Sequence, residues 1–329
     1  MECRPNQGGT PISGLMKTTM IDYPLELNSI GEAALHILSE AQQGSVLASV
    51  TNANYLLSSK GELCWLIPRG EPMHRRGVEV IGLLPRVKVG SRYEVASHTL
   101  AISSGVKVDF ENASIWKAPT LPSTRVISRT RLSESIPALV NRLLVLHNPS
   151  GLGGLITLIF QVTSSQNMAP EEWLTDGIRG KAWPVIKGML LASMAEDIPA
   201  MIARARNLIG LGEGLTPSGD DFLGGFFFSK RLLSLYYKEG FINDQIRTYT
   251  DFIAQSKPLT NPISYIILKD NAEGHSVEPL HQLANGLFLG ETGDSLTNLA
   301  EKLISLGHST GWDLLTGFLA GMSVKFSQL

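Results

Sequence analysis

The stretch GLGEGLTPSGDDFLGG (residues 210–225) packs six glycines and two adjacent aspartates into sixteen residues. An apolar helical pattern ends before it, and Gly210 stands where helices commonly end in the left-handed conformation. Thr216 favours extended backbone, because a residue that precedes proline avoids the α region. Ser218 is then a good N-cap for a second helix. The stretch therefore predicts two helices that meet at a sharp, glycine-lined turn.

A shorter stretch near the end of the chain repeats part of this pattern. SGDDFLGGF (218–226) aligns without gaps with TGWDLLTGF (310–318), and five of the nine positions are identical. The identical pairs are Gly219 and Gly311, Asp221 and Asp313, Leu223 and Leu315, Gly225 and Gly317, and Phe226 and Phe318. Each stretch begins a predicted helix after a polar loop that contains glycine. We therefore expect the two helix starts to converge on one pocket.

The first helix start offers competing kinds of chemistry. Free N–H groups there can hold an anion, but no lysine occurs between residues 207 and 229, so a Walker-type phosphate loop is not predicted. The acids Glu213, Asp220 and Asp221 would also oppose a bare anion. Either Asp220 or Asp221 holds a divalent cation such as Mg²⁺ or Mn²⁺ that bridges to the ligand, or Asp221 caps the helix while Asp220 binds a ligand N–H group. A purely structural alternative is close helix packing with acids that stabilise a first turn.

We predict one site built from both helix starts. Asp220, Asp221 and His308 are the predicted catalytic residues, and the two aspartates are also the candidate metal ligands. His308 can neutralise charge on a tetrahedral transition state or move a proton, or else satisfy a backbone carbonyl at a surface turn. The predicted substrate-binding residues, which offer backbone N–H groups or short polar side chains, are Gly212, Gly214, Thr216, Ser218, Gly219, Ser309, Thr310, Gly311, Asp313, Thr260 and Ser264.

Two weaker groups of candidates have no motif behind them. Thr260 and Ser264 belong to a proline-punctuated segment, for which a turn followed by a helix cap is the competing interpretation. Arg75, Arg76 and His98 are further possible contacts for an anion.

The secondary structure predicted for the rest of the chain changes along its length. Short apolar runs separated by turns, and the strict alternation of VKVDFEN (106–112), predict antiparallel strands. Ser29 and Glu32 make a plausible capping box for a helix over 29–42. The segment 151–163 is compatible with a strand or a buried helix. Apolar spacing predicts further helices at about 133–147, 196–210, 219–238, 244–256, 277–289, 294–306 and 311–326.

The expected fold class is α+β, with an N-terminal antiparallel β-rich domain followed by a mainly α-helical C-terminal domain. We place a flexible arm at 1–25, the β-rich domain at 26–120 and the helical domain at 121–329. The segment KAPTLPSTR (117–125) carries two prolines and a shift in composition, so it is the predicted linker.

The composition excludes several classes of partner. A hydrophobic fraction of 43% with 18% charged residues is typical of a globular chain, and 329 residues suggest two domains. A net charge of −2 without a basic cluster predicts no nucleic-acid partner, and apolar runs too short to span a bilayer predict no membrane partner. Cys3 and Cys64 form no close-spaced pair. We therefore expect a cytoplasmic protein.

Three elements together resemble one bacterial protein family. They are GLGEGLTPSGDDFLGG, then LTNPISYIIL with the following AEGHSVEPLHQLANGL, and finally GHSTGWDLLTGFLAG. In order and approximate spacing they are similar to the family that includes AllH, a subunit of oxamate carbamoyltransferase. The resemblance covers residues 208–320, and the β-rich half fits only in general layout.

The resemblance implies a part in anaerobic allantoin breakdown, in which oxalurate and phosphate are converted to oxamate and carbamoyl phosphate. It implies AllG-like and FdrA-like partner proteins, a small anionic or carbamoyl substrate, and a subunit that can be inactive alone. The S-T-R-T phosphate motif of ordinary carbamoyltransferases is missing here. Two other classes stay open: a non-catalytic scaffold with the glycine motif at a protein interface, and a metabolite-binding regulatory protein.

Overall fold

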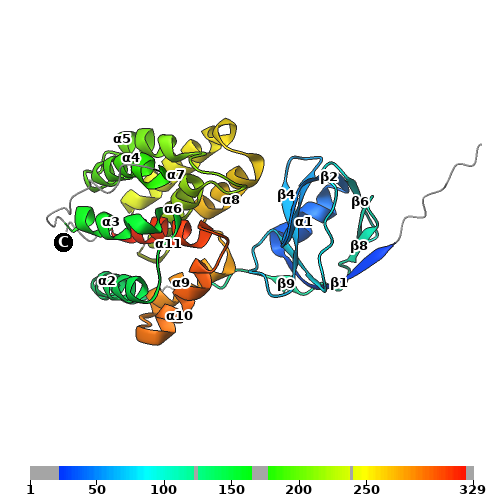
Figure 1. Cartoon of the computed structure of the whole chain (residues 1–329), viewed down its shortest axis with the longest axis horizontal. Coiled ribbons are helices and arrows are strands. Elements are labelled where there is room, and N and C mark those ends of the chain that lie inside the picture. The colour runs from blue at the N-terminus through cyan, green and yellow to red at the C-terminus, as the bar shows by residue number, and fades with distance from the viewer. Residues whose placement is uncertain (1–21, 122–124, 165–176, 238–239, 324–329) are drawn as a thin grey trace, which may run out of the picture.

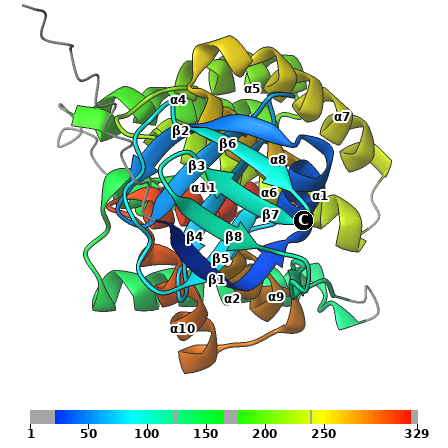
Figure 2. The same cartoon turned by 90° about the vertical axis from the view of Figure 1, so that its right-hand side faces the viewer.

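The chain folds into a closed β-sheet followed by a set of packed helices, which confirms the predicted α+β class. Figure 1 shows these as two adjoining parts along the long axis, and Figure 2 views the sheet in front of the helices. The computed structural model describes residues 22–121, 125–164, 177–237 and 240–323. Most of the predicted arm over 1–25 therefore lies outside the described residues, as do part of the predicted linker and Cys3.

Alternating apolar residues build the N-terminal sheet. Its strands are β1 (Tyr23–Gly31), β2 (Gln43–Val50), β3 (Ala53–Ser58), β4 (Leu63–Pro68), β5 (Gly77–Ile81), β6 (Arg92–Ala96), β7 (Thr99–Ile102), β8 (Val106–Asp109) and β9 (Ile115–Trp116). Their order is β5-β4-β3-β2-β6-β7-β8-β1-β9, and an additional β5–β1 pairing closes the sheet. In β8, Val106 and Val108 are buried while Asp109 is exposed, as the alternation predicts. The pairing of β8 is antiparallel with β7 but parallel with β1.

Helix α1 (Glu32–Glu40) packs its buried face, including Ile37 and Leu38, into the apolar core of the sheet. The predicted capping box at its start is wrong. Ser29 lies in strand β1, its hydroxyl donates to the Glu79 carboxylate at 2.9 Å, and the N-cap residue is Gly31 without a side-chain cap. The reason is that β1 stays paired with β5 and β9 up to the start of the helix, so that residue 29 belongs to the ladder.

The C-terminal part is helical. Its helices are α2 (Arg129–Leu146), α3 (Ile156–Thr163), α4 (Gly177–Met194), α5 (Ile198–Ala205), α6 (Ser218–Tyr237), α7 (Gly240–Gln255), α8 (Pro262–Glu273), α9 (Glu278–Leu289), α10 (Gly293–Ile304) and α11 (Thr310–Ser323), with short 3₁₀ turns η2 (Gly151–Leu155) and η3 (Arg206–Leu208). Every predicted helix is present with shifted ends, and the ambiguous segment 151–163 is helical. Helices α4 and α8 are missing from the list of predicted helices. In α4, Pro184 and several glycines are residues that usually mark the end of a helix and so argue against one.

Membrane spanning can be judged for the described helices. No single one of them is long and apolar enough to cross a bilayer. One pair, α2 with the segment 151–163, meets that standard together, although the two are bent by 114°.

Helices α6 and α11 cross at glycines in the centre of the helical part. A Cβ added at Gly225 would lie 2.0 Å from the Leu314 carbonyl oxygen, and one at Gly317 would lie 1.8 Å from the Phe222 carbonyl oxygen. The two contacts are equivalent, because residues 222 and 225 align with 314 and 317 in the repeated stretches. The repeat in the sequence therefore corresponds to two closely packed helices with a symmetric contact.

Helix α8 docks the helical part against the sheet. Beside a small apolar core that contains Trp65 and Ile266, the Arg76 guanidinium donates two hydrogen bonds to the Asp270 carboxylate, at 2.6 and 2.9 Å. Both side chains are buried, and Arg76 also donates to Glu62 at 2.9 Å. Arg76 thus holds the two parts of the chain together instead of contacting an anionic ligand.

His74 lies in the same interface and is buried. Its ring contacts that of Trp65 with 4.9 Å between centroids, and its Nδ1 accepts a hydrogen bond from the Arg76 backbone N–H at 3.2 Å. Burial lowers the pKa of His74 from 6.5 to about 4, although the Asp270 carboxylate opposes this shift. The interface therefore favours the neutral imidazole.

We expect the chain to lose stability as the pH falls from about 6.5 to about 4. In this window the unfolded chain binds a proton at His74 that the folded chain does not, which costs at most about 1.4 kcal/mol per pH unit. Urea unfolding at several pH values measures this slope. His74→Gln should reduce the slope without abolishing it, because burial also lowers the pKa of His281, to about 3. His36→Gln, at an exposed histidine, is the matched control; equal slopes in the two variants would contradict the assignment.

Candidate functional site

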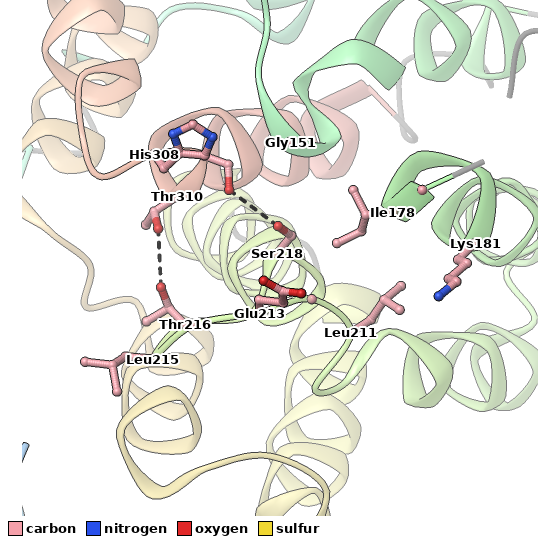
Figure 3. A pocket seen from close by; sticks show the side chains of 14 residues that line it. Gly151, Ile178, Lys181, Leu211, Glu213, Leu215, Thr216, Ser218, His308 and Thr310 are labelled. Atoms are coloured by element: carbon pink, nitrogen blue, oxygen red, sulfur yellow. Dashed lines mark hydrogen bonds between the residues drawn. The ribbon is translucent and has the colours of Figure 1, made fainter.

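A pocket of about 910 Å³ lies where the glycine-rich loop meets several helix starts. Figure 3 shows walls from α4 on one side and from α11 on the other, with the loop and the start of α6 between them. The predicted site residues that line it are Gly212, Gly214, Thr216, Ser218, His308, Ser309 and Thr310. The two repeated helix starts thus share one pocket, as the sequence predicts.

Hydroxyl groups join the two starts directly. The Thr216 Oγ1 lies 3.3 Å from the Thr310 Oγ1, and the Ser218 Oγ lies 3.5 Å from the Ser309 Oγ. Both pairs are marked by dashed lines in Figure 3. Because each pair contains one residue from either start, the pocket floor depends on the packing of α6 against α11.

Three helices begin at the pocket wall. Gly177, Ser218 and Thr310 are the first residues of α4, α6 and α11, and all three line the pocket. Helix starts carry unpaired N–H groups and the positive end of the helix dipole, so their convergence favours a negatively charged ligand. Lys181, from the first turns of α4, also lines the pocket and adds a full positive charge.

The loop that precedes α6 presents its backbone to the pocket. Gly212 and Gly214 have φ of 122° and 94°, a region that side chains disfavour. A Cβ at Gly212 would also lie 2.8 Å from the Ser218 nitrogen. Within the described residues, the N–H groups of Gly212, Gly214 and Ser218 donate no hydrogen bond to a backbone carbonyl of a turn or loop. These groups can bind oxygen atoms of a ligand.

Asp221 and Asp313 lie beneath the hydroxyl groups and occupy equivalent positions in the repeat. Asp221 of α6 is hydrogen-bonded by Thr216 and by Thr310, the first residue of α11. Asp313 of α11 is hydrogen-bonded by Ser309 and by Ser218, the first residue of α6. Each carboxyl therefore reaches across to the other helix. This exchange replaces the local capping box that the sequence predicts between Ser218 and Asp221.

Burial raises the pKa of both carboxyls, and the charge of Asp313 raises that of Asp221 further. The hydroxyl hydrogen bonds act in the opposite direction, because they stabilise the ionised form. Each carboxyl also keeps one buried oxygen, Oδ2, without a hydrogen-bond partner among the described residues. Asp313 is additionally fixed by the Leu152 N–H, which donates to its Oδ1 at 2.6 Å.

Asp220 points away from the pocket. Its Oδ1 accepts the Gly210 N–H at 2.7 Å, and its Oδ2 accepts the hydroxyls of Thr260 at 2.5 Å and Ser264 at 2.6 Å. The predicted residues Thr260 and Ser264 thus meet Asp220, but this group does not line the pocket. The cap of α8 is Asn261, which accepts the N–H groups of Ile263 and Ser264. Asp220 therefore anchors the glycine-rich loop, through Gly210, to the start of α8.

The predicted site residues Gly219 and Gly311 also lie outside the pocket lining. A Cβ at either would lie 2.0 Å from a backbone carbonyl oxygen, that of Leu208 and that of Leu303 respectively. Their N–H groups donate to Leu211 and Leu306. Both glycines permit each helix start to pack against the segment before it.

The candidate metal site finds no support in the arrangement of acids. Within the described ranges, no group of three or more His, Cys, Asp or Glu side chains is placed to hold a metal ion. Asp220 has all its contacts with protein donors, whereas Asp221 faces hydroxyl groups.

The sequence reasoning missed the basic groups of the site. Arg179 of α4 donates to the carbonyl oxygens of Gly151 at 2.7 Å and Pro149 at 2.9 Å, and so holds η2 at the pocket. Lys181 supplies the cation that a search restricted to residues 207–229 does not find. Ile178, Ala182, Ile186 and Met189 keep a helical spacing across Pro184, and this signal would have located α4.

Of the remaining predicted candidates, only His308 lies at the pocket. His308 is exposed at the pocket rim, and its backbone carbonyl accepts the Ser150 hydroxyl at 2.9 Å. His98 sits in a turn with φ of 61° and contacts the edge of Phe110. Neither His98 nor Arg75 lines the pocket. A second, polar pocket of about 810 Å³, lined in part by Glu79 and Lys302, lies between the sheet and the helices.

The comparisons with known proteins bear on the helical part of the chain. No solved structure matches the chain. One family model matches, and its description is oxamate carbamoyltransferase subunit AllH. The match runs from η3 to α11 and so includes the glycine-rich loop and both helix starts, but not α4 or the sheet. Residues 208–322 therefore match the family of the oxamate carbamoyltransferase subunit AllH, and the resemblance seen in the sequence is confirmed.

Proposed function

We propose that this chain is a subunit of an oxamate carbamoyltransferase-like enzyme and that the pocket at the helix starts binds its substrates. The proposed reaction converts oxalurate and phosphate to oxamate and carbamoyl phosphate, in the cytoplasm and in the anaerobic breakdown of allantoin. AllG-like and FdrA-like proteins are the proposed partners. The family match over residues 208–322 supports the assignment to such a subunit.

The observation that carries the proposal is the convergence of three helix starts and Lys181 on one pocket. Oxalurate and phosphate are both anions, so a site that brings them together must offset their repulsion. The helix starts and the Lys181 ammonium provide positive potential for this purpose. The hydroxyls of Thr216 and Thr310 add short polar groups that can bind a carbamoyl group.

The proposed chemistry needs charge stabilisation and one proton transfer. A phosphate oxygen attacks the carbamoyl carbon of oxalurate, the bond from that carbon to the oxamate nitrogen breaks, and the nitrogen takes the proton that phosphate gives up. We assign the backbone N–H groups of Gly212, Gly214 and Ser218 to the developing negative charge on oxygen. His308, at the rim, is assigned to the proton transfer.

Reconstitution tests the proposal. The chain is assayed alone and with AllG-like and FdrA-like proteins for phosphate-dependent cleavage of oxalurate. Turnover by the assembly that is lost in the His308→Gln variant and reduced in the Lys181→Met variant supports a catalytic subunit. Full turnover in both variants would make the chain a scaffold, and absence of turnover with ligand binding intact would make it a metabolite-binding protein.

We expect Lys181→Met to weaken phosphate binding about tenfold, because one hydrogen bond to a charged group contributes about 1.5 kcal/mol or more. Titration calorimetry of the whole chain with phosphate at low and high salt measures this, and the loss should be smaller at high salt. Lys88→Met, at an exposed lysine of the β-rich part, makes the same change in net charge and is the matched control. Equal binding by the two variants would exclude Lys181 from the phosphate site.

A further inference from the structure

The floor of the pocket consists of four hydroxyl groups above two buried carboxyls. We name Thr216, Ser218, Ser309 and Thr310 the hydroxyl quartet, and Asp221 and Asp313 the carboxyl pair. Thr216 and Thr310 hydrogen-bond to each other and lower the pKa of Asp221, while Ser218 and Ser309 hydrogen-bond to each other and lower the pKa of Asp313. All four members of the quartet line the pocket. The carboxyl pair itself is 4% and 0% exposed.

A hydroxyl group has one proton to donate and two lone pairs that accept. In each hydroxyl pair one proton is donated to the neighbouring hydroxyl, at 3.3 or 3.5 Å, and the other can be donated to the ionised carboxyl below. Neither hydroxyl then has a proton left for a ligand above. Their lone pairs then face the pocket and accept from N–H groups. The direction of the hydrogen bonds in the floor therefore decides which ligand atoms the pocket accepts.

We infer that the carboxyl pair orients the hydroxyl quartet as hydrogen-bond acceptors and thereby selects ligands that carry an NH₂ group, such as a carbamoyl or primary amide group. Asp221 and Asp313 act in this as positioning residues, because they reach the ligand through the hydroxyls. The inference rests on the proposed function in one respect, namely that this pocket is the ligand site. It holds for any amide ligand, whether or not the assembly transfers a carbamoyl group.

The surroundings of the carboxyl pair fit this role. Beside the larger effect of burial, the charge of Asp220 raises the pKa of Asp221, the charge of Asp221 raises the pKa of Tyr55, and the charge of Arg179 lowers the pKa of Asp313. A Cβ at Gly151, which lines the pocket, would lie 2.4 Å from the Asp313 Oδ1, so this carboxyl is directly beneath the wall. The pocket then offers two kinds of group, the hydroxyl acceptors of the floor and the N–H donors of the loop. One suits an amide NH₂ and the other suits anionic oxygen.

The test compares two ligands of equal charge and similar shape. Oxamate carries an NH₂ group where pyruvate carries a methyl group, and both are monoanions. Binding of each to the whole chain is measured by titration calorimetry at pH 8.5, because the raised pKa values of the carboxyl pair favour its neutral form at lower pH. Wild-type chain should bind oxamate about fivefold to tenfold more tightly than pyruvate, the value of one good hydrogen bond.

Asp221→Asn and Asp313→Asn should reduce this preference toward unity. An asparagine can donate its own N–H to the hydroxyls and so release their protons toward the pocket. Glu213→Gln removes a lining carboxylate that makes no hydrogen bond to the quartet, and it should change both affinities equally. An unchanged preference in both aspartate variants would overturn the inference, as would a wild-type chain without preference for oxamate.

A second pair of variants keeps the test decisive if the aspartate variants do not fold. Thr310→Val removes one hydroxyl and leaves the carboxyl pair intact, so it should lower oxamate affinity without a matching loss for pyruvate. Thr310→Ser restores the hydroxyl and should restore the preference. Equal affinities in these two variants would also overturn the inference. These outcomes are distinct from a failure of the proposed function, which is read from turnover of oxalurate and not from ligand preference.

Discussion

Gly317→Ala is expected to lower the free energy of unfolding by about 3 kcal/mol, which is at the upper end for overpacking of a tight contact. The added Cβ would lie 1.8 Å from the Phe222 carbonyl oxygen on the neighbouring helix, and a backbone atom cannot move aside as a side-chain tip can. Helices α6 and α11 must then separate along their crossing. Thermal unfolding should show a fall in Tm of about 5–10 °C for a chain of this size.

The control is a glycine inside another helix. At Gly188 of α4 the nearest atom to an added Cβ is the Arg204 Cδ at 3.4 Å, which is an ordinary contact. Gly188→Ala should therefore stabilise the chain by about 0.5–1 kcal/mol through helix propensity. Gly225→Ala, equivalent to Gly317→Ala in the repeat, should also destabilise it, because its Cβ would lie 2.0 Å from the Leu314 carbonyl oxygen. Similar unfolding free energies for Gly188→Ala and Gly317→Ala would contradict the close packing.

Separation of these helices should also reach the pocket. The hydroxyl pairs that join the two starts span 3.3 and 3.5 Å, so a small displacement between the helices breaks them. The glycines that let α6 and α11 pack closely therefore also position the two helix starts that form the pocket. The structural and functional interpretations of the repeated stretches are not alternatives.

The sequence carries the fold class because its local patterns are strong. Alternation located β8, and helical spacing located the first residues of α6 and α11 to within one residue. The repeat predicted the shared pocket correctly, because its shared glycines, Gly225 and Gly317, let α6 and α11 pack closely. The predicted capping box at Ser29 was wrong, because a capping motif depends on neighbouring residues only, whereas the pairing of β1 with distant strands does not.

The division of labour between Asp220 and Asp221 could not be predicted. Adjacent residues on a helix point about 100° apart, so only one of the two can lie beneath the hydroxyl groups of the pocket. Which one does so depends on tertiary contacts. Asp220 turns to Thr260 and Ser264, which are forty residues away or more. Lys181 could not be placed for the same reason, because it reaches the pocket from a helix that the site motifs do not include.

Arg76→Met is expected to destabilise the chain by about 3–5 kcal/mol, because it leaves the buried Asp270 carboxylate without its ion-pair partner. Asp270 is 0% exposed and has no access to water that would replace the guanidinium. The double variant Arg76→Met/Asp270→Leu removes both charges and should recover most of the lost stability. Lys60→Met breaks an exposed pair with Glu40 and should cost at most about 1 kcal/mol.

The dependence on pH separates this ion pair from simple loss of packing. The Arg76 hydrogen bond and charge lower the pKa of Asp270 below 3.8 against the effect of burial. A carboxyl with a lowered pKa stabilises the fold above its unfolded pKa, and this contribution is lost as the pH falls through the folded value. In Arg76→Met, burial without the guanidinium raises the pKa of Asp270, so the variant takes up this proton at a higher pH than the wild-type chain does. The stability gap between the two chains should therefore be largest at neutral pH and shrink as the pH falls toward 3. A gap that stays constant down to pH 3 would mean that Arg76 acts through the packing of its aliphatic stem, and the ion pair would then have no net role in holding α8 against the sheet.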